Sequence, residues 1–110
     1  IQSHRIPDSV FRIMRHKGGL GAAGSHPAVF PVALVEAVLE AFTDPGDLVF
    51  EPFCGSGTQL VAAERTGRRC RAVELDPVYC DVAVRRWTTA TGRKAERPSI
   101  DQIGYWTHTF

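Results

Sequence analysis

The chain has 110 residues, which allows one domain that buries roughly two thirds of the surface its unfolded chain exposes. Hydrophobic residues make up 44% and charged residues 23%, a balance that suits a packed core with a soluble exterior. The net charge of +1 argues neither for nor against nucleic-acid binding. Because no apolar run approaches the roughly 18 residues that span a bilayer, and no signal peptide is visible, we expect a cytoplasmic protein without membrane contact.

The three cysteines, Cys54, Cys70 and Cys80, form no C-x-x-C pair and have no histidine at ligand spacing. This pattern is typical of reduced thiols in a cytosolic protein, so we expect no metal. The chain begins at Ile1 rather than methionine, and we therefore expect that an upstream part is missing.

The first third of the chain leads into a helix. Residues 10–14 are mostly apolar and predict a strand, and the glycine-rich residues 17–24 predict a linker, with a mobile lid as the alternative. Pro27 and Pro31 favour an extended path before a helix at 32–42. Helical spacing predicts one apolar stripe on this helix, opposite Glu36 and Glu40: Val35, Val38, Leu39 and Phe42.

A strand, a glycine loop and a second helix come next. The turn 44–47 precedes an apolar strand at 48–50, and the helix at 59–66 follows the loop. Gly67 is expected to end that helix in a left-handed conformation. A second strand at 70–73 leads to Glu74.

Asp76 and Pro77 predict the start of a third helix, with Asp76 as its cap, and Gly92 predicts its end. The alternation of strands and helices predicts parallel pairing, hence an α/β, partial Rossmann-like fold with flanking helices. We expect an N-terminal strand and linker at 1–24, the α/β core at 25–95 and a tail at 96–110.

The glycine loop and Glu74 together indicate a ligand with two different ends. An acid about 20 residues beyond such a loop, at the tip of the next strand, binds ribose hydroxyls in nucleotide-binding folds. The amides around Ser56, Gly57 and Thr58 suit an anion at a helix start. The loop lacks the lysine of a P-loop, and Leu60 replaces the third glycine of a dinucleotide site. A carboxylate at one end and a ribose at the other describe S-adenosyl-L-methionine, which we predict as the cofactor.

Three segments carry a family resemblance that covers about two thirds of the chain. Residues 51–58, Glu-Pro-Phe-Cys-Gly-Ser-Gly-Thr, resemble the Asp-Pro-Phe-x-Gly-Ser-Gly-Thr cofactor motif of the DNA amino-methyltransferases, which modify adenine N6 or cytosine N4. Residues 26–34 resemble the motif that precedes it, and residues 73–87 resemble the one that follows. Glu51 stands where the family has Asp, and its carboxylate is still expected to reach the cofactor's amino group.

The loop and the resemblance together single out one set of residues. We predict the cofactor-binding residues to be His26, Pro27, Glu51, Pro52, Phe53, Gly55, Ser56, Gly57, Thr58 and Glu74.

Several of these side chains have simpler interpretations as well. Ser56 and Thr58 suit helix capping, and Phe53 suits core packing as well as a pocket wall. His26 also suits a turn or a hydrogen bond. We expect no nucleophilic role for Cys54 and no catalytic residue in this chain. Arg85 and Arg86 are expected on a solvated helix face.

The sequence departs from the family in one important respect. It contains no Pro-Pro, whereas these enzymes use a Pro-Pro-aromatic motif to grip the target amine and stack on the flipped base. In the family's β subclass that motif precedes the cofactor half. The resemblance therefore implies the cofactor-binding, C-terminal portion of a site-specific DNA methyltransferase, of the kind found in restriction-modification systems, that is inactive alone.

The expected binding partners of this chain follow from its place as the cofactor-binding portion of a larger enzyme. It would meet DNA only through the complete enzyme, with the catalytic half upstream or in another chain, and open strand edges predict self-association. The alternatives are a non-catalytic accessory subunit that binds the cofactor, or a fragment of an RNA or small-molecule methyltransferase.

Overall fold

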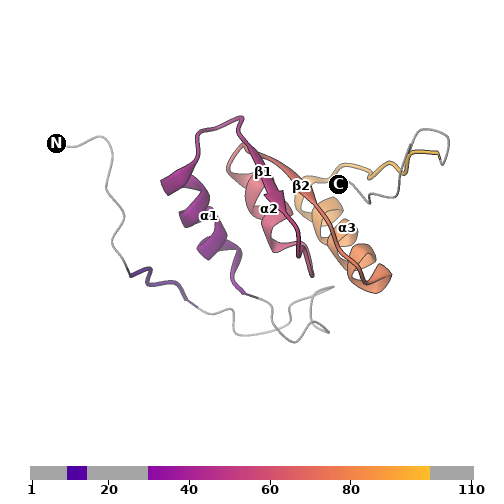
Figure 1. The fold of residues 1–110 in the computed structure, drawn as a ribbon, viewed down its shortest axis with the longest axis horizontal. Helices are drawn as coiled ribbons and strands as arrows, with labels where there is room; N and C mark the ends of the chain where they lie inside the picture. The colour runs from indigo at the N-terminus through magenta and orange to yellow at the C-terminus, as the bar shows by residue number, and fades with distance from the viewer. Residues whose placement is uncertain (1–9, 15–29, 100–110) are drawn as a thin grey trace.

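The computed structural model describes residues 10–14 and 30–99, which contain helices and a parallel pair of strands (Figure 1). In chain order the elements are α1 (Val32–Phe42), β1 (Leu48–Glu51), α2 (Thr58–Arg65), β2 (Arg69–Ala72) and α3 (Pro77–Thr91). β1 pairs with β2 in parallel, with Leu48 opposite Arg69 and Glu51 opposite Ala72. The α/β arrangement and the parallel pairing predicted from the sequence are confirmed.

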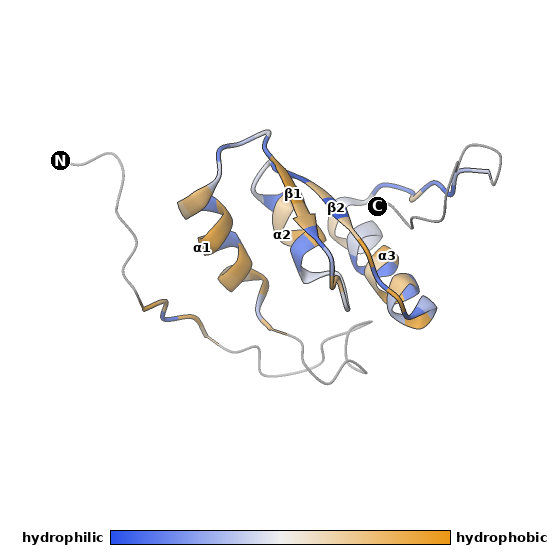
Figure 2. Cartoon of the chain, viewed as in Figure 1, coloured by the Kyte–Doolittle hydropathy of each residue, from blue (hydrophilic) through white to orange (hydrophobic). Residues whose placement is uncertain are grey.

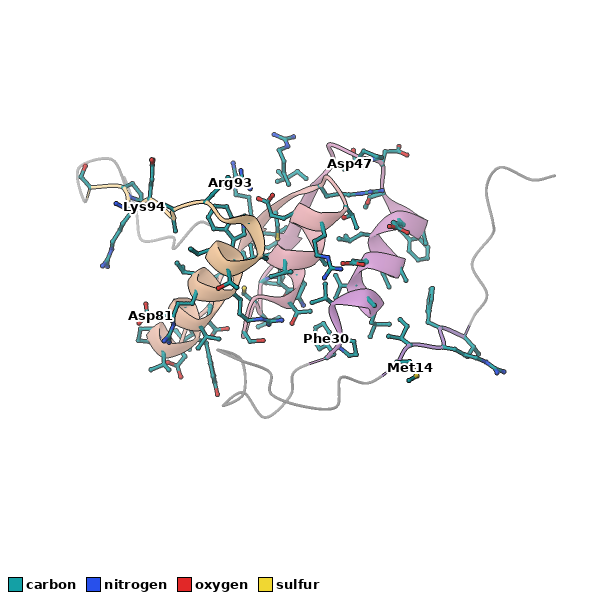
Figure 3. The ribbon with its side chains drawn as sticks, turned by 180° about the vertical axis from the view of Figure 1, so that it is seen from behind. Met14, Phe30, Asp47, Asp81, Arg93 and Lys94 are labelled. Carbon is teal, nitrogen blue, oxygen red and sulfur yellow. The ribbon has the colours of Figure 1, made fainter. Side chains whose placement is uncertain are left out.

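The helices cover one face of the strand pair. β1 and β2 lie in front of α2 in Figure 1, with α1 to one side of them, and α2 lies in front in the reverse view of Figure 3. Side chains alternate along a strand, so every second residue faces the helices. On this covered face Val49 and Cys70 pack against Leu39, Ala62 and Ala63.

Within the described residues, the opposite face of the strand pair is open. Leu48 and Phe50 on β1 are 54% and 65% exposed, and their partners Arg69 and Arg71 on β2 are also exposed. Figure 2 shows most of β1 as hydrophobic, although half of its side chains face solvent. We call these four residues the open sheet face.

Helix α2 lies at the centre of the core and contacts α1, β2 and α3. Its small residues make this possible, because Ala62 and Ala63 are almost completely buried and let neighbouring backbones approach. On the side toward α3, Leu60 packs with Ala72 and Ala83.

The helix ends agree with the sequence. Asp76 Oδ1 accepts a hydrogen bond of 2.9 Å from the Val78 N–H, so Asp76 caps α3 as predicted. Gly67 and Gly92 have φ angles of 74° and 68° just beyond α2 and α3. Both glycines therefore end their helices in the left-handed region, where a side chain would be strained.

Two predictions about the first part of the chain were wrong, the second only in part. Residues 10–14 form no strand. On α1 the predicted stripe is confirmed for Val35 and Leu39, which pack in the core with Val32, whereas Val38 and Phe42 are 39% and 77% exposed. Glu36, expected to face away, forms an ion pair of 2.9 Å with Arg65 of α2.

The buried stripe of α1 is narrower than predicted because α1 packs chiefly against a single neighbour, α2, which covers only a narrow strip of its surface. Helical periodicity alone does not reveal which edge of an apolar stripe will be the covered one.

Gly57 determines how closely the start of α2 can approach α3. It has a φ of 85°, and a Cβ placed on it would lie 2.8 Å from the Ala83 Cβ and 2.9 Å from the Ala83 Cα. The Ala83 backbone belongs to α3, so relief of this contact requires α3 to move.

We predict that Gly57→Ala destabilises the fold more than Gly67→Ala does. Both substitutions place a side chain at positive φ, at a cost of about 1–2 kcal/mol, but nothing lies within 4 Å of a Cβ at Gly67. Overpacking against Ala83 should add about 1–3 kcal/mol at Gly57. Urea unfolding followed by circular dichroism measures both, and equal losses would contradict the close contact.

Candidate functional site

The loop between β1 and α2 is attached to the end of β2 by backbone hydrogen bonds. The Cys54 N–H donates to the Val73 carbonyl at 3.0 Å, which extends the strand pairing beyond Ala72. The Gly55 N–H then donates to Glu74 Oε2 at 2.6 Å. The glycine loop and the acid that the sequence singled out therefore lie together.

Both oxygens of the Glu74 carboxylate are oriented by backbone amides. Oε2 accepts from Gly55, and Oε1 accepts from the Asp76 N–H at 2.9 Å. Each carboxylate oxygen can accept a second hydrogen bond, so the group keeps the capacity to bind a diol. Glu74 is half-buried, so its side chain contacts the loop and is still accessible to a ligand.

The N-terminus of α2 presents amides beside the same loop. The Gly57 N–H donates to the Cys54 carbonyl, and the first bond of the helical ladder runs from the Val61 N–H to the Gly57 carbonyl. The amides of Thr58, Gln59 and Leu60 precede that ladder and carry the partial positive charge of a helix start. They suit an anionic group.

A pocket of about 200 Å³ lies beside the glycine loop and the N-terminus of α2. Its lining residues are Phe30, Phe53, Cys54, Gly55, Ser56, Thr58 and Gln59. Phe53 is 85% exposed, so of its two predicted roles the structure has the pocket wall and not core packing. Figure 3 shows Phe30 at the same end of the molecule as Asp81 near the start of α3, opposite the end with Asp47 and Arg93.

Gln59 lines this pocket, and sequence analysis did not identify it. Its Oε1 is buried and has no hydrogen-bond partner among the described residues. One signal in the sequence could have identified Gln59. It is a polar residue in the first turn of the helix, where side chains lie beside the free helix amides.

Ser56 and Thr58 do not cap α2, which contradicts their simpler interpretation. Gly57 occupies the cap position, and α2 has no side-chain cap. Both hydroxyls instead accept hydrogen bonds from Arg86 Nη1, at 2.8 Å and 3.0 Å. Arg86 is half-buried, so its predicted place on a solvated face was wrong, whereas Arg85 is exposed as expected.

The remaining predicted residues have less defined surroundings. Glu51 Oε1 accepts from the Phe53 N–H at 2.8 Å, which shapes the start of the loop, and Pro52 is exposed. His26 and Pro27 lie outside the described residues.

Cys54 lines the pocket but does not have the properties of a nucleophile. It is 4% exposed, and burial, with smaller contributions from Cys70, Glu51 and Glu74, raises its pKa to about 12. The thiol is therefore protonated at neutral pH, and the thiolate is the reactive form. All three cysteines are free.

The described part of the chain has no cluster of three His, Cys, Asp or Glu residues that could hold a metal ion. None of its helices is long and apolar enough to cross a membrane.

Comparison with known proteins places these features in a family. A family model described as DNA methylase, for N6 and N4 methyltransferases, matches residues 2–85. The type II methyltransferase M.Cfr9I of Citrobacter freundii is 45% identical over 64 residues, which cover 58% of this chain and 21% of that protein. The DNA adenine methyltransferase YhdJ of Escherichia coli K12 is 30% identical over 92 residues, 84% of this chain and 31% of that protein.

Solved structures agree with the sequence relatives. TTHA0409, a DNA modification methylase from Thermus thermophilus solved with S-adenosyl-L-methionine, aligns with a TM-score of 0.54 and 44% identity, over 56% of this chain and 25% of that one. The cytosine-N4-specific PvuII DNA methyltransferase aligns with a TM-score of 0.66 and 30% identity, over 74% of this chain and 32% of that one. The predicted cofactor is thus the one found in a solved relative.

The chain spans about a fifth to a third of the length of these two curated relatives. The family match covers most of this chain, and the fold and the predicted motifs agree with it. This chain belongs to the N6/N4 DNA methyltransferase family and corresponds to a portion of such an enzyme.

Proposed function

We propose that this chain is the cofactor-binding portion of a DNA methyltransferase that transfers a methyl group from S-adenosyl-L-methionine to the exocyclic amine of adenine or cytosine. The observation that carries the proposal is the hydrogen bond between the Gly55 N–H and Glu74 Oε2. It brings a diol acceptor next to the helix start that suits a carboxylate, as the two ends of this cofactor require.

The binding mode follows from the site's chemistry. Glu74 accepts hydrogen bonds from the ribose hydroxyls, and the first amides of α2 donate to the methionine carboxylate. Phe30 and Phe53 give the pocket apolar walls, and the unpartnered Oε1 of Gln59 offers an acceptor to the cofactor's ammonium group. His26 and Pro27 keep their proposed role at the methionine end on the strength of the family resemblance.

The contribution of this chain to the reaction is positioning. The cofactor would supply an electrophilic methyl group on its sulfonium. The target amine would take this methyl in line and lose a proton, with the neutral thioether S-adenosylhomocysteine as the leaving group. The residues of this chain hold that methyl in one orientation, which reduces the entropic cost of bringing two reactants together. No acid or base of this chain is required for that task.

We infer that the catalytic motif comes from outside this chain, either from an upstream segment or from another polypeptide. The sequence has no Pro-Pro, and the open sheet face is the surface expected of a sheet whose second layer is contributed elsewhere. DNA would be met through that complete assembly.

The chain is predicted to bind S-adenosyl-L-methionine by itself, and Glu74→Gln is predicted to weaken binding about tenfold. Glutamine keeps one acceptor oxygen but loses the charge and the second acceptor for the diol, and a hydrogen bond to a charged group contributes about 1.5–3 kcal/mol. Isothermal titration calorimetry measures both affinities. Glu40→Gln, an exposed change on α1, is the matched control and should leave binding unchanged.

A parent chain that is folded by circular dichroism and gives no binding heat would refute the proposed cofactor site. Equal affinity in the parent and in Glu74→Gln would show that the ribose does not rest on this carboxylate.

The purified chain is predicted to transfer no methyl group to DNA, since the residues that grip the target base are missing. The assay incubates the chain with cofactor labelled on the methyl group and with mixed-sequence DNA, then counts label in the DNA. A complete N6/N4 methyltransferase serves as the positive control. Label transfer by this chain alone would contradict the proposal that the catalytic motif comes from outside it.

The isolated chain is also predicted to self-associate through the open sheet face and the strand edges. Contact with a second copy would bury the apolar side chains there and pair the backbone groups at the strand edges. Light scattering at micromolar concentration should give a mass above the monomer, and Phe50→Lys should reduce it. Phe42→Lys changes an exposed phenylalanine of α1 instead, and a monomeric parent, or equal effects of both variants, would argue against this surface.

A further inference from the structure

Arg86 connects α3 to the glycine loop through a single nitrogen. Its Nη1 donates to the Ser56 carbonyl at 3.0 Å, to Ser56 Oγ at 2.8 Å and to Thr58 Oγ1 at 3.0 Å. These acceptors lie on either side of Gly57, where α2 begins. One guanidinium therefore holds the residue before Gly57 and the first residue of α2, where the amides proposed for the ligand's carboxylate begin.

The same face of α3 holds the loop at a second point. Ala83 lies three residues before Arg86, roughly one helical turn, and is the residue that Gly57 approaches too closely for a Cβ to fit. A close backbone contact and a side-chain clamp thus fix the loop on α3 from two directions. The orientation of the loop amides is set by α3 as well as by the loop's own hydrogen bonds.

The charge of Arg86 lacks a counterion in the described part of the chain. Its three acceptors are neutral oxygens, and no carboxylate there forms an ion pair with it. Burial lowers its pKa, with a small opposing effect from Cys54. A half-buried cation next to the positive end of a helix is unfavourable unless an anion occupies the site.

Arg85 shows that this arrangement is specific to one of two adjacent arginines. It is exposed, and among the described residues its Nε donates only within its own helix, to the Asp81 carbonyl at 3.4 Å. The helix turns by about 100° between neighbouring residues, which directs one guanidinium into the loop and the other into solvent.

We propose that Arg86 is a positioning residue for the carboxylate end of the cofactor: it orients the Ser56 and Thr58 segment and adds positive charge beside it. This inference rests on the proposed function and deepens it by assigning α3 a role in ligand selectivity. Arg86 acts on the amino-acid end of the ligand, while Glu74 acts on the ribose end.

The test compares two ligands that differ only at the amino-acid end. S-adenosylhomocysteine carries the carboxylate and ammonium, and 5′-methylthioadenosine lacks both but keeps the nucleoside. With the full chain, Arg86→Gln should weaken binding of S-adenosylhomocysteine about tenfold and leave binding of 5′-methylthioadenosine within about twofold. Arg85→Gln, the matched control, should change neither affinity.

Equal losses for the two ligands in Arg86→Gln would overturn the proposal, because a general defect in the fold would not discriminate between them. An unchanged affinity for S-adenosylhomocysteine would overturn it as well. If circular dichroism shows that Arg86→Gln does not fold, the same comparison uses Ser56→Ala, which removes one of the three acceptors. A selective loss for S-adenosylhomocysteine then supports the proposal, and an equal or absent loss overturns it.

The ligand pair also separates this inference from the proposed function. A folded parent chain that binds neither compound would refute the cofactor site and the role of Arg86 together. A parent chain that binds both, with no selective loss in the variants, would refute the role of Arg86 alone.

Discussion

The hydrogen bond between the Gly55 N–H and Glu74 Oε2 is the interaction on which this site depends. It joins the ends of two neighbouring parallel strands, and parallel pairing is what brings residues 19 positions apart to one edge of the sheet. Without it the loop and the acid would be separate features of a surface. With it the loop and the acid lie side by side, and α2 begins next to them with the free amides of its first turn.

Close packing behind the loop makes that geometry rigid. The central helix α2 offers alanines to its neighbours, and Gly57 lets α3 approach to a distance that any side chain would prevent. Arg86 then reaches the loop from α3. The glycine loop is therefore held by α3 as well as by its own hydrogen bonds, and the proposed role of Arg86 rests on this arrangement.

Within the described residues the strand pair is covered on one face only, and this asymmetry connects the fold to the family. The helices lie behind the two strands, while Leu48 and Phe50 face solvent on the other side. Parallel sheets are normally covered on both faces. The chain matches only a fifth to a third of its curated relatives, and the proposed remainder of the enzyme would cover such a face.

The sequence alone determined the order of helices and strands from residue 32 onward, their glycine and aspartate boundaries, and the pairing of the loop with Glu74. The element boundaries are local, because turn chemistry and capping act over a few residues, and the pairing of the loop with Glu74 follows from the regular geometry of two consecutive parallel strands. Only the tertiary structure decided which edge of α1 is buried, that Phe53 lines a pocket, that Gln59 enters it, and that Arg86 rather than Arg85 meets the loop. Those outcomes depend on which element lies opposite each side chain, and helical periodicity describes a helix without its neighbours.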